Sequence, residues 1–250
     1  MNREQYAEML RTISEVHKVG GDIHKCIMEY REKYKYVYIY NDSIFKMLFG
    51  NPENMRMTAS FLNAILKLDG GDCIDNLTFV NQAENCDLTI IKTSGDAIEK
   101  TRLERIELRV QHDERDFFKK SLVFFTDRKE TSTNLYKDSF WSSNFSLINL
   151  LLCGDSSDSE NYRHCLFFES DETKSLQLKQ NIIFIDILKF FKGRYATDES
   201  RLAQWLRVIE SLNNETPLAI IEDFPFFQLQ KNAELGNFND DFLLKEALIF

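Results

Sequence analysis

The stretch RIELRVQ, residues 105–111, carries an unusual row of polar side chains. In a β-strand successive side chains point to opposite faces, so Glu107, Arg109 and Gln111 would share one face. The positions between them are apolar and would form the other face. A half-buried surface strand usually carries interchangeable polar residues, so an acid, a guanidinium and an amide in one row raise the question of what chemistry they serve.

A second carboxylate, Asp87, stands at the start of the apolar stretch 88–92. An aspartate at a strand end is most often a turn former or a cap. Asp87 is also a candidate site residue, because its strand can form a hairpin with the strand that carries Glu107. Two carboxylates at the ends of adjacent strands can share a Mg²⁺ ion, which prefers oxygen ligands and usually keeps several waters. We therefore predict Asp87 and Glu107 as metal ligands.

The elements that position these residues can be predicted from periodicity and from capping and breaking residues. Apolar stripes, a Gly20-Gly21 break and Pro52 predict helices at 3–18, 22–34, 42–49 and 52–68. The helix at 42–49 has Asn41 or Asp42 as its cap candidate. Strands are expected at 77–80, 87–92, 103–111, 143–152, 162–170 and 181–188, with a helix at 114–128 and helices again from 197 onward. This order predicts an α/β fold with a mixed central sheet flanked by helices.

Composition and charge exclude several classes of protein. The chain has 250 residues and a net charge of −9, although residues 100–137 carry ten basic against seven acidic side chains. That local excess favours contact with phosphate only weakly, because a solvated helix face would also explain it. No stretch has the roughly 20 apolar residues of a membrane span, and the five cysteines show no disulfide framework, so we expect a cytoplasmic protein. Zinc-ligand spacing, a P-loop, G-x-S-x-G and G-x-G-x-x-G are all missing from the sequence.

The stretch NDSIFKMLFGNPENMRMTASFLNAIL resembles the opening of the PD-(D/E)XK nuclease family transposases, also called recombination-promoting nucleases. That opening reads D-x-x-F-K-x-L-F-G and is followed by a helix ending in F-L-N-A-I-L. Further on, DLTIIK is similar to the central aspartate strand of the family, and RVQHDERDFFKKSLVFF is similar to its E-x-Q strand and basic helix. The resemblance covers roughly residues 41–190. The opening motif is matched at Asp42, Phe45, Lys46, Leu48, Phe49, Gly50 and 61–66.

The chain departs from the family pattern at Arg109. If Gln111 is the glutamine of E-x-Q, the position of the family's glutamate is occupied by Arg109, which cannot ligate a cation. In a second register, Glu107 to Arg109 is itself an E-x-K-like triplet with arginine in place of lysine. The spacing leaves open whether the acid is relocated to Glu107 or lost.

The resemblance implies a Mg²⁺-dependent DNA endonuclease with a restriction-endonuclease-like core at 41–192. A helical hairpin at 1–40 would precede this core and an acidic helical region at 193–250 would follow it. Gln111 or Arg109 would position the attacking water or the scissile phosphate, and Asp42 is a further candidate or only a cap. Arg115, Lys119 and Lys120 would contact DNA, unless they only balance neighbouring acids. The alternative is a nuclease fold without catalysis that binds DNA or protein, and the sequence leaves homo-oligomer formation open.

Overall fold

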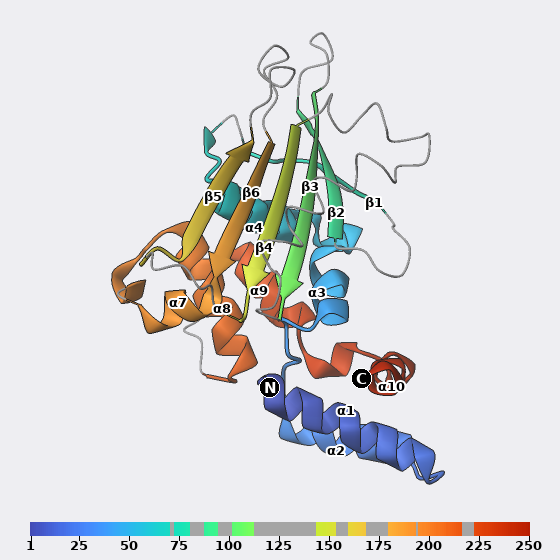
Figure 1. Ribbon diagram of the computed structural model, residues 1–250. Helices are drawn as coiled ribbons and strands as arrows, with labels where there is room; N and C mark the ends of the chain where they lie inside the picture. Colours follow the sequence, from blue (N-terminus) through green and yellow to red (C-terminus); the bar gives the residue numbers. More distant parts are fainter. Residues whose placement is uncertain are drawn as a thin grey trace. The chain divides into compact units, whose positions relative to one another are not determined.

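The protein is seen in a computed structural model that describes residues 1–70, 73–80, 88–94, 102–112, 144–153, 160–168, 180–193, 195–216 and 223–250 (Figure 1). Contacts within the chain define two compact units. The helical unit comprises residues 1–73 and 199–250, and the sheet unit comprises residues 74–198. The part of the chain that the structure describes contains no helix long and apolar enough to cross a membrane.

The helical unit combines segments from both ends of the chain. Its N-terminal part contains α1 (Arg3–Lys18), α2 (Ile23–Lys33), α3 (Asp42–Phe49), the 3-10 turn η1 (Pro52–Asn54) and α4 (Met55–Leu66). Its C-terminal part contains α8 (Arg201–Asn213), α9 (Phe224–Asn232), the 3-10 turn η4 (Leu235–Asn237) and α10 (Asp240–Ile249). Helix α10 packs against α1 and α2, and α4 packs against α8 and α9. The two ends of the sequence therefore share one core.

Side-chain caps fix the helix starts that the sequence predicts. The Asp22 side chain accepts a hydrogen bond from Lys25 N at 2.9 Å and begins α2, as expected. At α3 the cap is Asn41, whose side chain accepts from Ile44 N at 3.1 Å, so Asp42 is the first helical residue and not the cap. Asp42 is exposed, and its charge there favours the positive end of the helix. The Gly20-Gly21 break separates α1 from α2, with Gly20 in the left-handed region at φ 69°.

A buried amide, Asn54, connects the family's opening motif to the C-terminal part of the helical unit. Asn54 is 4% exposed, and its Nδ2 donates to Leu48 O at 2.7 Å, just before the end of α3. Its Oδ1 accepts from Gln228 Nε2 at 3.1 Å and from Asn232 Nδ2 at 2.7 Å, both on α9. Replacing this amide would leave buried polar groups without partners, which is more costly than losing an exposed hydrogen bond.

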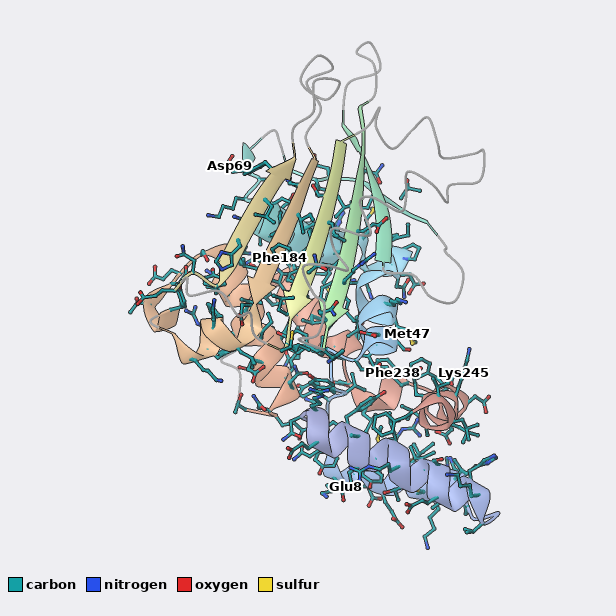
Figure 2. All side chains as sticks on the ribbon, in the orientation of Figure 1. Glu8, Met47, Asp69, Phe184, Phe238 and Lys245 are labelled. Atoms are coloured by element: carbon teal, nitrogen blue, oxygen red, sulfur yellow. The ribbon has the colours of Figure 1, made fainter. Side chains whose placement is uncertain are left out.

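An ion-pair network fixes α10 to the N-terminal hairpin. Asp240 at the start of α10 contacts His24 Nδ1 at 2.6 Å and Arg31 at 2.8 Å. Arg31 also donates to the carbonyl of Phe238, which is labelled in Figure 2, at 2.6 Å. Desolvation would raise the pKa of Asp240, but hydrogen bonds and charge from His24 and Arg31 outweigh it, so the pKa lies below its ordinary value.

The sheet unit is built on six strands in the order β1-β2-β3-β4-β6-β5 (Figure 1). Strands β3, β4 and β6 are parallel to one another, whereas β1, β2 and β5 join the sheet through antiparallel pairs. The unit also contains α7 (Ile187–Lys192) and the 3-10 turn η3 (Tyr195–Thr197). The strands are β1 (Leu77–Val80), β2 (Leu88–Ser94), β3 (Arg102–Gln111), β4 (Asn144–Leu151), β5 (Arg163–Phe168) and β6 (Gln180–Asp186). The predicted mixed sheet is therefore present.

One strand prediction is wrong at its end. The apolar stretch 181–188 does not remain extended, because β6 ends at Asp186 and α7 begins at Ile187. Asp186 is fully buried, and its side chain accepts from Lys189 N at 2.8 Å as a helix cap. The predicted helix at 114–128 lies outside the described residues. The expected domain boundaries near 40 and 192 stay a prediction, although residues 41–73 group here with the terminal helices.

The Asp240 network gives a pH-dependent prediction. Because the pKa of Asp240 is lower when folded, its contribution to stability is present above the unfolded value near 3.8 and is lost as the pH falls through the folded value. We expect Asp240→Asn to lower the free energy of unfolding by about 1 kcal/mol at pH 7, with a loss that shrinks below pH 4. Urea unfolding of the variant and the natural sequence, at pH 7 and again below pH 4, measures the difference in the free energy of unfolding. Asp241→Asn, an exposed neighbour in the same helical turn, is the control, and equal losses for both variants would contradict the network.

Candidate functional site

The polar row on β3 lies within the sheet as the sequence predicts. β3 runs from Arg102 to Gln111, so Glu107, Arg109 and Gln111 alternate with residues of the other face. Its antiparallel neighbour β2 pairs Thr89 with Glu107, and its parallel neighbour β4 pairs Asn149 with Arg109. Glu107 therefore has a described strand on each side, whereas Arg109 and Gln111 are paired with β4.

Glu107 is a carboxylate buried in the middle of a sheet. Its exposed fraction is 1%, which the alternating pattern did not predict, because that pattern is typical of a half-buried strand. On the opposite face, Ile106 and Leu108 are equally buried, so this part of β3 is covered on both sides. Burial of an ionised carboxylate is costly unless a positive charge or hydrogen bonds accompany it.

Arg109 supplies that positive charge. Its guanidinium nitrogen lies 3.6 Å from a carboxylate oxygen of Glu107, and its side chain is 17% exposed. Both residues stand on the same strand two positions apart, which is the spacing that brings alternate side chains to one face. The two charges cancel within the row, so a substrate anion or a metal cation would meet a dipole and not a net charge.

An amide on the next strand, Asn149, extends the row across the sheet. Asn149 is 1% exposed and pairs with Arg109 on one side and with Phe184 of β6 on the other. Figure 2 labels Phe184 in the body of the sheet. Asn149 is not among the predicted site residues, because the stretch NFSLINLLL shows only the pattern of a strand. The available signal was a single amide between leucines in that strand.

Most of the other predicted site residues are not described by the structure. Asp87, Arg115, Lys119 and Lys120 lie outside the described residues. Asp42 belongs to α3 of the helical unit, whereas Glu107, Arg109 and Gln111 belong to the sheet unit. The structure therefore assembles Glu107, Arg109 and Gln111 on one strand face and adds Asn149 beside them.

The row contains oxygen atoms of the type that bind a hard cation. Mg²⁺ prefers carboxylate and carbonyl oxygens, which Glu107 and Gln111 carry, but the Arg109 guanidinium repels a cation. Within the described part of the chain, no group of three His, Cys, Asp or Glu residues could hold a metal ion. The residues fit a divalent ion if a further carboxylate, such as that of Asp87, joins Glu107.

The buried pair predicts unequal effects of single and double substitutions. Arg109→Leu should lower the free energy of unfolding by about 2 kcal/mol, because it leaves the Glu107 charge buried without its guanidinium and because Arg109 is itself partly exposed. Adding Glu107→Gln to Arg109→Leu should recover most of that loss, since no charge remains to be compensated. Urea unfolding of the two single variants and the double variant measures this coupling, and additive losses would contradict it.

Comparison with known proteins identifies the family. The family model described as "PD-(D/E)XK nuclease family transposase" matches residues 39–240. The searches of curated proteins and of solved structures found no match. The matched segment reaches beyond the resemblance at 41–190 and takes in α8, α9 and the first residue of α10. The mixed sheet with its helices agrees with the restriction-endonuclease-like fold, and the family implies a nuclease-like function with DNA as the substrate. The chain belongs to the PD-(D/E)XK nuclease family transposases.

Proposed function

We propose that this protein is a metal-dependent DNA endonuclease whose site is built on the polar face of β3. The observation that carries the proposal is the buried Glu107 carboxylate, which lies on one strand face with Arg109 and Gln111 in a chain of a nuclease family. A buried charge at the centre of a sheet is costly to keep and contributes little to stability by itself. Catalysis gives a reason for its presence.

Glu107 and Asp87 would hold the metal ion, with Mg²⁺ as the favoured species because the donors are oxygens. Asp87 is the residue before Leu88, and Leu88 pairs with Leu108, the neighbour of Glu107. Hydrolysis by such a site needs no nucleophilic side chain, because a bound divalent ion polarises the phosphodiester and activates water. Glu107 would hold its carboxylate in place through its burial in the sheet.

Arg109 would bind and orient the scissile phosphate. A guanidinium presents several fixed N–H donors that match phosphate oxygens, and it keeps its charge at any physiological pH. Gln111, one step further along the same face, would hold the attacking water through its amide. Arg115, Lys119 and Lys120 would contact other phosphates of the DNA backbone. Asp42, the first residue of α3, would support its helix and remains a further site candidate.

A second candidate function is a nuclease fold that has lost catalysis and acts as a binding or regulatory protein. The contact of 3.6 Å between Arg109 and Glu107 favours it, because the guanidinium stands where a cation would approach the carboxylate. In this reading Arg109 replaces the family's acid and neutralises the remaining one. The protein would then bind DNA or another protein without cleaving it.

We further propose a reducing compartment, the cytoplasm, as the site of action. Cys26, Cys73 and Cys165 carry free thiols, which reducing conditions maintain. Access to chromosomal or plasmid DNA would follow from that location.

Substitutions that change the charge of Glu107 or Arg109 on β3 distinguish the endonuclease from the binding protein. If Glu107 is the working ligand and Arg109 holds the phosphate, Glu107→Ala should abolish cleavage, and Arg109→Glu should reduce it about a hundredfold by repelling the substrate. If Arg109 instead replaces a lost acid, Arg109→Glu should create a second carboxylate and raise cleavage. A plasmid-nicking assay with Mg²⁺, Mn²⁺ and Ca²⁺ distinguishes these outcomes.

Glu160→Ala is a matched control in the same unit, because that side chain is exposed and should leave nicking unchanged. Thermal unfolding of each variant shows whether lost activity reflects lost folding. If neither the natural sequence nor any variant cleaves nucleic acid with any of these ions, the endonuclease proposal is wrong. The binding function then remains.

The basic residues of the zone 100–137 give a separate prediction. Lys119→Ala combined with Lys120→Ala should weaken DNA binding with little dependence on sequence, and it should reduce the salt slope by about 1 to 2. The reason is that each lysine paired with a phosphate releases a condensed counterion. Fluorescence anisotropy with duplex DNA over a range of salt concentrations measures the slope. An unchanged slope would assign these lysines to a solvated surface.

A further inference from the structure

We infer that Asn149 is an additional substrate-binding residue, which donates a hydrogen bond from its side-chain amide to a phosphate oxygen of DNA beside Arg109. This inference rests on the proposed nuclease function and extends it from one strand to two. It assigns a role to a residue of β4 that neither the family's sequence pattern in this chain nor the spacing of its acids indicates.

The placement of Asn149 follows from strand register. Residues paired across parallel strands lie side by side on the same face, and β3 and β4 pair Arg109 with Asn149. Adjacent strands are about 4.8 Å apart, so the two side chains start from neighbouring points of the polar face. Glu107 and Gln111 lie one step before and one step after Arg109 on that face. Asn149 therefore belongs to the same site by geometry.

The surroundings of Asn149 on its own side of the sheet are apolar. Leu147 and Leu151 precede and follow it on the same face of β4, and both are fully buried. Its partner on β6 is Phe184, which is also buried. A leucine at position 149 would continue this apolar surface, so an amide here needs an explanation that packing does not supply.

The amide nitrogen of Asn149 is buried, and within the described part of the chain it has no hydrogen-bond partner. A buried donor without an acceptor destabilises the folded protein. A ligand that supplies the missing partner is one reason for a protein to keep such a group. The buried amide therefore points to an acceptor that arrives on the polar face.

The chemistry of that acceptor follows from the neighbouring groups. Arg109 has donors only, and the Asn149 nitrogen is also a donor, so the two side chains together favour an anion with several acceptor oxygens. A phosphodiester fits this requirement, because its two non-bridging oxygens can accept from a guanidinium and from an amide at the same time. The carboxylate of Glu107 then lies next to the bound phosphate. A divalent ion held by Glu107 would stand beside that phosphate, as metal-assisted hydrolysis requires.

Asn149→Leu tests the inference because binding and structural roles predict opposite results for stability. If the amide serves substrate, the leucine removes an unsatisfied donor, so the melting temperature should stay the same or rise. Plasmid nicking in Mg²⁺ should fall about tenfold to a hundredfold, and the Kd for a short fluorescent duplex DNA in Ca²⁺ should rise. Asn149→Asp should lose DNA binding more strongly, since it presents a negative charge to the phosphate.

The control is Ser146→Ala on the same strand, because Ser146 is equally buried but pairs with Ile106 on the opposite face. It should leave nicking and DNA binding unchanged. Asn149→Leu with a lower melting temperature would show a structural role and overturn the inference. If Asn149→Leu cleaves and binds DNA as well as the natural sequence does, the inference about Asn149 is also wrong, but the nuclease proposal is unaffected. If the natural sequence neither binds nor cleaves DNA, the nuclease proposal and this inference both fail.

Discussion

The sheet unit depends on one constraint, the burial of the Glu107 carboxylate between strands on both sides. A charge with an exposed fraction of 1% needs compensation, and Arg109 provides it from the same strand. That requirement restricts what the neighbouring strands can carry on this face. On this face β4 carries Asn149 between two leucines. β6 carries Ile182, Phe184 and the buried Asp186. Apolar side chains such as Ile106 and Ile148 hold the opposite face.

The sequence predicts local structure well where one residue decides it. Asp22 ends a glycine break and caps α2, and the alternation in RIELRVQ places Glu107, Arg109 and Gln111 on one face as observed. It is wrong at the end of β6, although the deciding contact there is also local. The stretch IDIL looks extended by composition, yet the Asp186 side chain caps α7 and ends the strand. The burial of Glu107 could not be predicted either, because alternation shows which residues share a face but not what covers that face.

The packing of the helical unit could not be predicted from local sequence patterns either. The sequence predicts the helical hairpin and the acidic tail as two separate segments, because neither segment shows which part of the chain it contacts. In the structure, His24 and Arg31 of α2 meet Asp240 of α10, and Asn54 binds two amides of α9. These contacts also give a physical reason for the length of the family match, which continues through α9 to residue 240. The segment after the opening motif thus binds partners far along the chain, since Asn54 and Gln228 are 174 residues apart.

The contact between Glu107 and Arg109 has opposite consequences for folding and for chemistry. In the folded protein without substrate, the guanidinium offsets the buried carboxylate and thereby weakens its attraction for a cation. A bound phosphate would draw the guanidinium toward its own oxygens and would restore the negative potential at Glu107. Metal and DNA would then strengthen each other's binding, because each removes the charge that opposes the other. Under the proposed function, such a site would hold its acid in a neutral pair until the substrate arrives.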